Sequence, residues 1–357
     1  MKVKLRDVSN IIMGQSPDSS TYNTEKIGLP FFQGNADFGE LNPIAKTWCS
    51  APIKIAYKNY ILISVRAPIG ALNIAAETCC IGRGLAAFDV NNKMCTQKYL
   101  WYLLKAKKNE LLSKGTGSTF KAISKNILSE MEFNIPPVRE QELCTKVLDV
   151  VFCLIRLKKE QLDKLDLLVK SRFIEMFGDP VTNEKGWVKV RLADKCCIIT
   201  GNTPPRANEK YYGSYIEWIK SDNITSSMYL TKAAEYLSEE GLAVGKKVES
   251  GSVLMTCIAG SLKSIGNVAI ADRPVTFNQQ INAVVTNEQN TLFMYEQFKL
   301  TKEYITCDVN MALKGILSKG QLSEKQFIFP PIELQNQFAD FVVQVDKSKF
   351  VVTAKFQ

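Results

Sequence analysis

The sequence predicts a mixed α/β (α+β) protein with two tandem-repeat globular domains, each followed by a long helix. The first observation is that residues 138–177 contain no Gly or Pro, whereas prolines lie on both sides of this stretch. The second is that the segment PPVREQ at 136–141 returns as PPIELQ at 330–335. The third is that the start of the chain returns near residue 190. Ordered matches of this kind indicate duplication of one unit.

The internal repeat extends over most of the chain. The other matching segments are VKLRD at 3–7 with VRLAD at 190–194, GQSP at 14–17 with GNTP at 201–204, and AISK at 122–125 with ILSK at 316–319. The predicted order is therefore a domain at 1–135, a helix at 136–180, a domain at 181–329 and a helix at 330–357.

Each globular domain is expected to contain short strands and one prominent helix. Apolar runs bounded by turn residues predict strands at 3–5, 31–33, 60–65, 72–75, 85–90 and 131–134 in the first domain. Thr96 is a good N-cap for a helix that ends at Gly115 and has a face of Tyr99, Leu100, Leu103, Leu104 and Leu111. The same patterns in the second domain predict strands at 215–220 and 252–257 and a helix at 292–301.

The two long helices are expected to pair with each other. Apolar residues recur every three or four positions and form one narrow stripe on each helix. The stripe residues are Leu143, Val147, Val150, Leu154, Leu157, Leu162, Leu165 and Val169 on the first helix and Phe338, Phe341 and Val345 on the second. About 40 residues at ~1.5 Å each give a rod of roughly 60 Å. A rod of this length with charged outer faces needs a partner helix, and the second repeat supplies one.

Composition excludes several classes of function. The chain has no histidine, which removes Ser-His-Asp and Cys-His nucleophiles and His-containing metal sites. No apolar run reaches the roughly 18–20 residues that cross a bilayer, and the first residues become charged too early for a secretory signal. The 10 cysteines lack Cys-x-x-Cys spacing, so we expect no metal site and reduced thiols in the cytoplasm. The net charge of +9 suits a polyanionic partner.

Three short motifs are similar to enzyme motifs but do not fit them. Asn134-Ile135-Pro136-Pro137 differs from the Asn-Pro-Pro-aromatic loop of amino-methyltransferases, because an isoleucine interrupts it and no aromatic residue follows. Pro17-Asp18 is not followed by the Asp-x-Lys or Glu-x-Lys of a nuclease. Gly82-Arg83-Gly84 lacks the strand–turn–helix context of a nucleotide-binding loop. We therefore expect no catalytic residue in this chain.

The loops carry a different signal. Basic residues recur in Gly-, Ser- and Pro-rich connections of both domains, together with amides and hydroxyls. Positive side chains hold phosphates, whereas Arg, Asn and Gln read base edges. The candidate DNA-binding residues are Arg66, Arg83, Lys114, Ser118, Lys121 and Lys125 in the first domain and Arg206, Lys220, Asn223, Lys263, Asn278, Gln279, Gln280, Lys314 and Lys319 in the second. Any one of them is as readily a solvated surface residue, but their recurrence favours DNA binding.

The whole chain resembles the specificity subunit of type I restriction–modification systems. The resemblance is carried by the two domain starts, the two Pro-Pro-x-x-x-Gln helix starts and the segment SRFIEMFGDP at 171–180. It implies two target recognition domains that each read one half of a split double-stranded DNA sequence, joined by long antiparallel coiled-coil helices. It also implies docking of two methyltransferase subunits and of nuclease–translocase subunits. S-adenosylmethionine, ATP and Mg would bind those partners, and no cofactor is expected on this chain.

One departure from this family concerns the second helix. At the offset of 194 between the helix starts, Gln357 corresponds to Asp163, so the counterpart of residues 164–177 is missing. The apolar residues of that stretch are therefore expected to be partly bare: Leu165, Val169, Phe173 and Met176. Either the chain is a shortened variant, or another subunit covers the gap.

Two other classes of function remain open. A protein–protein scaffold built from duplicated domains would have the same organisation, with basic loops that are incidental. Salt-dependent DNA binding by the assembled complex distinguishes it from a specificity subunit. A solo nuclease or methyltransferase ranks third, and it would show activity in the purified chain alone.

Overall fold

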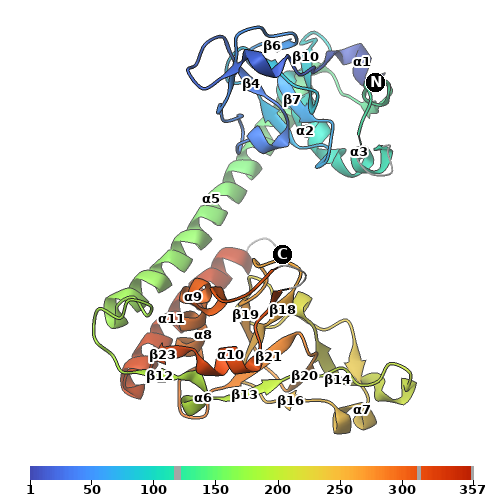
Figure 1. The fold of residues 1–357 in the computed structure, drawn as a ribbon. Helices are drawn as coiled ribbons and strands as arrows, with labels where there is room; N and C mark the ends of the chain where they lie inside the picture. The colour runs from blue at the N-terminus through green and yellow to red at the C-terminus, as the bar shows by residue number, and fades with distance from the viewer. Residues whose placement is uncertain (116–121, 312–314, 355–357) are drawn as a thin grey trace. The chain divides into compact units, whose positions relative to one another are not determined.

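The computed structural model describes residues 1–115, 122–311 and 315–354. The chain divides into two compact units, Met1–Arg156 (unit 1) and Leu157–Gln357 (unit 2), and the division falls within the long helix α5 (Val138–Phe177). Both units contain helices and strands, as the sequence predicts (Figure 1). Three candidate DNA-binding residues, Ser118, Lys121 and Lys314, lie outside the described residues.

The described part of unit 1 contains two larger sheets and one two-stranded sheet. Its strands are β1 (Lys2–Lys4), β2 (Ser9–Met13), β3 (Tyr22–Asn23), β4 (Leu29–Phe32), β5 (Trp48–Cys49), β6 (Ile55–Ala56), β7 (Ile61–Ser64), β8 (Leu72–Ile74), β9 (Cys79–Ile81), β10 (Leu85–Val90) and β11 (Glu132–Asn134). Its helices before α5 are α1 (Leu5–Val8), α2 (Gln97–Ala106), α3 (Lys108–Lys114) and α4 (Lys125–Ser129). One sheet has the order β2-β10-β7-β8, the other has the order β3-β5-β4-β9-β6, and β1 pairs with β11.

The core of unit 1 follows the alternation of side chains along β7. Ile61 and Ile63 belong to a cluster with Leu100 and Leu104 of α2, whereas Leu62 belongs to a second cluster. Successive side chains of a strand point to opposite faces, so one strand serves both cores. The predicted strand at 60–65 is confirmed, and the Thr96 hydroxyl caps α2 as expected. The single helix predicted from Thr96 to Gly115 is divided at Lys107 into α2 and α3.

Unit 2 has a closely related plan. Its strands are β12 (Lys189–Arg191), β13 (Cys197–Thr200), β14 (Tyr212–Ile219), β15 (Tyr236–Leu237), β16 (Lys247–Val248), β17 (Val253–Thr256), β18 (Ile258–Ala259), β19 (Val268–Ile270), β20 (Val275–Phe277), β21 (Ile281–Val285), β22 (Gly315–Ile316) and β23 (Gln326–Ile328). Its helices after α5 are α6 (Leu192–Lys195), α7 (Glu239–Val244), α8 (Thr291–Leu300), α9 (Lys302–Thr306), α10 (Lys319–Glu324) and α11 (Ile332–Ala354).

The strand orders confirm the duplication. The sheet β13-β21-β17-β19 repeats the sheet β2-β10-β7-β8, and each unit has one parallel pair, β4 with β9 and β14 with β20. The pair β1–β11 places Val3 opposite Phe133, and the pair β12–β23 places Val190 opposite Phe327. The segments that match in the sequence therefore have the same partners in the two units.

The repeated glutamine of the Pro-Pro-x-x-x-Gln segment has a structural reason. Gln141 is buried, donates to the Pro136 carbonyl at 2.9 Å and accepts from the Thr96 amide at 2.8 Å. Gln335 is also buried and accepts from the Asn290 amide at 2.9 Å. Thr96 and Asn290 are the N-caps of α2 and α8. Each glutamine thus ties the start of a long helix to the start of an earlier helix in the same unit, α2 or α8.

The helix α11 packs antiparallel on the second part of α5 (Figure 1). Both of these segments belong to unit 2. Near the start of α11, the Phe338 ring contacts Phe173 and Phe177, with centroids 5.3 and 5.7 Å apart. Near its end, Lys349 Nζ lies 2.5 Å from Asp166 Oδ1. The pairing of the two helices is therefore confirmed for this part of α5.

The expectation of a bare stretch near the end of α5 is wrong. Val169 and Phe173 are buried, and Leu165 and Met176 are partly buried against the same cluster. The error came from matching equivalent residues side by side, which is the geometry of a parallel pair. In an antiparallel pair, the start of α11 covers the end of α5.

The exposed apolar stripe lies earlier in α5. Its residues are Leu143 (57% exposed), Val147 (64%), Val150 (59%), Leu154 (48%) and Leu157 (49%). The sequence predicts that these five residues pack against the second long helix. In the structure, the described residues leave about half or more of each side chain exposed. We call them the α5 stripe.

Candidate nucleic-acid interface

In unit 1, three segments meet at one edge where strands end. The first segment follows β2, the second follows β7, and the third connects β9 to β10. We call the third segment, residues 82–84, edge turn 1. The Gly84 carbonyl accepts from the Val65 amide at 2.9 Å, and the Arg83 amide donates to the Ser16 hydroxyl at 3.3 Å. These bonds fix the three segments to one another.

Unit 2 repeats this arrangement. Residues 278–280, called edge turn 2, connect β20 to β21. The Gln280 carbonyl accepts from the Cys257 amide after β17 at 2.7 Å. The Thr203 hydroxyl, which follows β13, donates to Oε1 of Gln279. In both units, then, a hydroxyl residue after the first strand of the four-stranded sheet contacts the turn. The last carbonyl of the turn accepts from the segment after β7 in unit 1 and after β17 in unit 2.

A glycine brings the first segment close to the turn in each unit. A Cβ atom on Gly14 would lie 2.2 Å from the Gly82 carbonyl oxygen, and one on Gly201 would lie 2.2 Å from the Asn278 carbonyl oxygen. Both distances are far inside van der Waals contact, so the approach requires a residue without a side chain. In the matching segments GQSP and GNTP, the glycine is therefore needed for close packing against the turn. The Ser or Thr two residues later supplies the hydroxyl that contacts the turn.

The side chains of the two turns differ. The exposed middle residue is Arg83 in edge turn 1 and Gln279 in edge turn 2. The last residue is Gly84 in unit 1, where a Cβ would lie 2.4 Å from the Gln33 carbonyl oxygen. In unit 2 that place holds Gln280, whose Oε1 accepts from the Ser221 hydroxyl at 3.3 Å.

Five predicted cations are exposed and form no ion pair within the described part of the chain. They are Arg66, Arg83, Lys125, Lys263 and Lys319. Lys125 and Lys319 hold equivalent places, because each is the first residue of a short helix that a serine caps. These side chains are free to bind phosphates.

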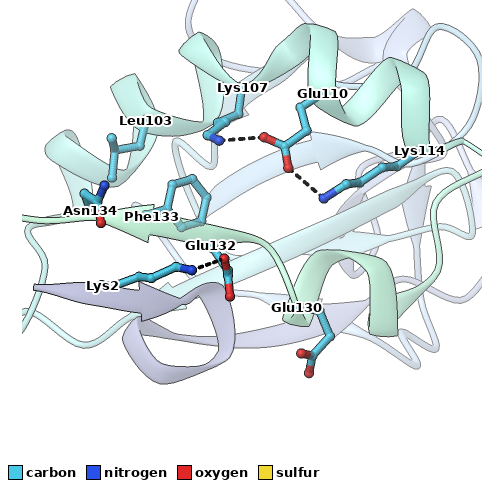
Figure 2. Close-up of a pocket in the computed structure, with 9 residues that line it drawn as sticks. All are labelled: Lys2, Leu103, Lys107, Glu110, Lys114, Glu130, Glu132, Phe133 and Asn134. Atoms are coloured by element: carbon cyan, nitrogen blue, oxygen red, sulfur yellow. Dashed lines mark hydrogen bonds and ion pairs between the residues drawn. The ribbon is translucent and has the colours of Figure 1, made fainter.

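Lys114 is different, because a carboxylate holds its charge. It lines a polar depression of about 420 Å³ in unit 1, which Figure 2 shows. Glu110 lies 2.6 Å from both Lys114 and Lys107, and Lys2 pairs with Glu132 at 2.6 Å. The depression therefore lacks the excess of positive charge that attracts a phosphate backbone.

Arg206 and Lys220 share one carboxylate in unit 2. Arg206 Nη2 lies 2.7 Å from one oxygen of Glu235, and Lys220 hydrogen-bonds the other. The Arg206 guanidinium also lies 4.9 Å from the centroid of the Trp218 ring. The hydrogen bond from Lys220 is the main reason why the pKa of Glu235 lies below its ordinary value. Glu235 is thus ionised at neutral pH and offsets one of the two positive charges.

Of the predicted amides, only Gln279 is exposed. Asn223 is buried, and its Oδ1 accepts from the Lys220 amide at 2.9 Å. Asn278 is buried as well, and its Oδ1 accepts from the Gln280 amide at 3.1 Å. Asn223 and Asn278 therefore shape the backbone of their turns, which leaves Gln279 as the amide that faces solvent.

Burial keeps three of the cysteines in the thiol form. All ten cysteines are free thiols. Burial raises the pKa of Cys79, Cys196 and Cys257 to about 12, so these three stay protonated at neutral pH. Within the described residues, no three Cys, Asp or Glu side chains gather as metal ligands. No described helix is long and apolar enough to cross a membrane.

Residue patterns alone did not identify the groups that position the two turns. Ser16 and Thr203 contact the turns, and Ser221 holds Gln280. The repeat of GQSP as GNTP was the available signal for Ser16 and Thr203, since it keeps a hydroxyl after the glycine in both units.

Comparisons with known proteins agree with this architecture. A family model described as the type I restriction modification DNA specificity domain matches residues 1–167 and again residues 184–355. The MjaIX specificity subunit of a type I restriction enzyme from Methanocaldococcus jannaschii is 24% identical over 95% of this chain and 85% of its own length. A putative MjaX specificity subunit from the same organism is 40% identical over 45% of this chain, and the match spans 38% of that protein.

A solved structure shares the fold. The S subunit of a type I restriction–modification system from M. genitalium has a TM-score of 0.57 and 15% identity, and the match covers 99% of this chain and 91% of that one. The twofold match of the family model corresponds to the two units and their equivalent edge turns. The chain therefore belongs to the family of type I restriction modification DNA specificity proteins, with one specificity domain in each half.

Proposed function

We propose that this chain is the DNA-sequence specificity subunit of a type I restriction–modification complex and that each unit reads one half of a split target. The observation that carries the proposal is the repeated edge. Two units hold equivalent turns with equivalent backbone bonds, yet they present Arg83 in one case and Gln279 in the other. One scaffold that displays two different side chains suits the recognition of two different half-sites.

The chemistry of the complex is assigned to its partners. S-adenosylmethionine, ATP and Mg would bind methyltransferase and nuclease–translocase subunits, and this chain would contribute specificity without catalysis. The complex would act in the cytoplasm, where the ten thiols stay reduced.

The α5 stripe is the proposed docking surface for a methyltransferase subunit. The other face of this part of α5 is already occupied within unit 1: Asp149 binds Lys98 at 2.7 Å and Tyr102 at 2.9 Å, and the Phe152 ring contacts Trp101. The stripe therefore faces away from the globular part of unit 1. An apolar helix face of this kind is suited to a helix of the partner.

The test is to co-express the chain with its cognate methyltransferase subunit and to map the methylated bases in the host DNA. We expect one split sequence with two defined halves. Binding of that sequence by the purified complex should weaken steeply as salt rises, because phosphate contacts release counterions. Methylation without a defined sequence, or DNA binding that does not respond to salt, would favour the scaffold alternative.

A further inference from the structure

We propose that the middle residues of the edge turns read bases, with Arg83 reading a guanine in one half-site and Gln279 an adenine in the other. The inference rests on the proposed function and adds the chemical identity of one base pair in each half-site. It starts from the equivalence of the two turns in the repeated scaffold.

Arg83 is presented by a rigid turn. The Gly82 amide donates to the Phe32 carbonyl at 2.8 Å, and the Gly84 amide donates to the Gln33 carbonyl at 3.1 Å. The Arg83 amide itself is bonded to the Ser16 hydroxyl. With the backbone fixed on both sides, the turn loses little conformational freedom when the guanidinium binds.

The Arg83 guanidinium is also available. The side chain is exposed and forms no ion pair with any described residue, unlike Arg206 in unit 2. A free guanidinium offers two parallel N–H groups, and the O6 and N7 acceptors of guanine match them. Arg83 is therefore suited to guanine, which is the base that arginine reads most often in the major groove.

Gln279 is held in a different way. Its Oε1 accepts a hydrogen bond from Thr203, while Asn278 and Gln280 on either side are bonded to each other. The two neighbours are turned inward, so Gln279 is the group of edge turn 2 that extends into solvent. A fixed amide oxygen with one lone pair left accepts from adenine N6, and the amide nitrogen donates to adenine N7.

Free cations lie next to edge turn 1. Gly84 is bonded to Val65, which precedes Arg66, and Val65 in turn is bonded to Ile123, which lies two residues before Lys125. Arg66 thus follows a residue that is hydrogen-bonded to the turn, and Lys125 lies on the next segment, which is hydrogen-bonded to Val65. Cations beside a reading residue fix its register on the duplex through phosphates.

The experiment uses the co-expressed complex and sequencing of methylated bases. Arg83→Ala should relax one G·C position in one half-site, so that discrimination there falls by roughly 10- to 100-fold. Gln279→Ala should relax one A·T position in the other half-site by a similar factor. Arg83→Lys keeps the charge but loses the paired N–H groups, and it should relax the same position as Arg83→Ala.

The matched control is Lys125→Ala. This exposed cation is expected to bind phosphate, so its loss should weaken binding of all sequences equally, lower the salt slope by about one and leave the methylated sequence unchanged. The inference is overturned if Arg83→Ala and Arg83→Lys keep every position of the wild-type sequence, or if the relaxed position is not G·C. A wild-type complex that methylates no defined sequence would instead refute the proposed function itself.

Discussion

Unit 1 and unit 2 share a scaffold and differ in what they display on it. The strand order of one four-stranded sheet, the buried glutamine at the helix start and the glycine against the edge turn are the same in both. The exposed residue of the turn and the covering of the long helix are different. The helix α11 packs on the later part of α5 in unit 2, whereas the stripe residues of α5 that belong to unit 1 are exposed. The comparison shows that packing positions are repeated and that contact positions have diverged.

One difference between the units has a simple steric origin. In unit 1, Gln33 separates the end of β4 from the next cap at Gly34, whereas in unit 2 the cap Lys220 follows β14 directly. The carbonyl of Gln33 occupies the place that a Cβ on Gly84 would need. The additional residue therefore excludes from unit 1 the amide that unit 2 carries as Gln280.

The two parts of α5 should respond very differently to substitution, and this is the largest expected effect. Phe173 is fully buried and its ring stacks on Phe293 at 5.4 Å. Phe173→Ala should lower the free energy of unfolding of unit 2 by about 3–5 kcal/mol. Val150→Lys, at a position 59% exposed, should change stability by no more than about 0.5 kcal/mol.

The measurements are denaturant unfolding of the chain and co-purification with the methyltransferase subunit. Val150→Lys should reduce co-purification although the chain stays folded. If Val150→Lys destabilised the chain as much as Phe173→Ala does, the α5 stripe would be part of a core and not a docking surface.

The glycines at the edge turns test whether the scaffold is truly shared. Gly14→Ala and Gly201→Ala each force a Cβ against a carbonyl oxygen, and each should destabilise its unit by about 2–3 kcal/mol. Each should also abolish recognition of one half-site, a different half for each variant. Gly34→Ala is the control, since a Cβ there meets nothing within 4 Å. Unfolding curves in which both scaffold variants match Gly34→Ala would show that the close approach is not required.

The buried glutamines should be equivalent. Gln141→Ala and Gln335→Ala both leave an N-cap amide without its partner, and each should cost about 1–2 kcal/mol of unfolding free energy. Gln337→Ala, at an exposed place on α11, is the matched control and should be close to neutral. A large effect in one unit alone would mean that the two motifs have diverged in their structural role.

The smallest expected effect concerns pH. Burial, more than any other cause, raises the pKa of Glu296 on α8 above its ordinary value. A carboxyl whose folded pKa is raised favours the folded state when protonated, so its contribution to stability falls as pH rises from the ordinary value through the folded one. Glu296→Gln should therefore stabilise unit 2 at neutral pH and lose this advantage in acid.

Unfolding at a series of pH values checks this expectation. The same place in unit 1 holds the uncharged Tyr102, which bonds Asp149 on α5. Tyr102→Phe should show no comparable pH dependence between pH 4 and 7. Stability of Glu296→Gln that follows the wild-type curve at all pH values would contradict the role of burial.

Sequence repeats predicted the fold well because they record packing. Pro-Pro-x-x-x-Gln, GQSP with GNTP, and VKLRD with VRLAD all proved to be segments whose surroundings are the same in both units. Helix direction was not recorded in this way, since an apolar stripe fits a parallel or an antiparallel partner equally well. That is why the bare part of α5 was predicted at the wrong end.

The candidate site was harder to predict, because a basic residue in a loop carries no sign of its partners. Lys114, Arg206 and Lys220 read as free cations in the sequence, but carboxylates hold them in the fold. The recurrence of basic residues in the two units does not hold at the place of Arg66. The strand pairings place Ile258 there instead, because Arg66 pairs with Ala122 as Ile258 pairs with Ile316.

The central claim is that each unit reads one half of the target on its own. Its most direct test is to replace residues 1–135 with the corresponding residues of a related specificity subunit and to map the methylated sequence of the co-expressed complex. The account predicts that one half of the split sequence changes to that of the donor, while the other half is retained base for base. A change in both halves, or in neither, would contradict it.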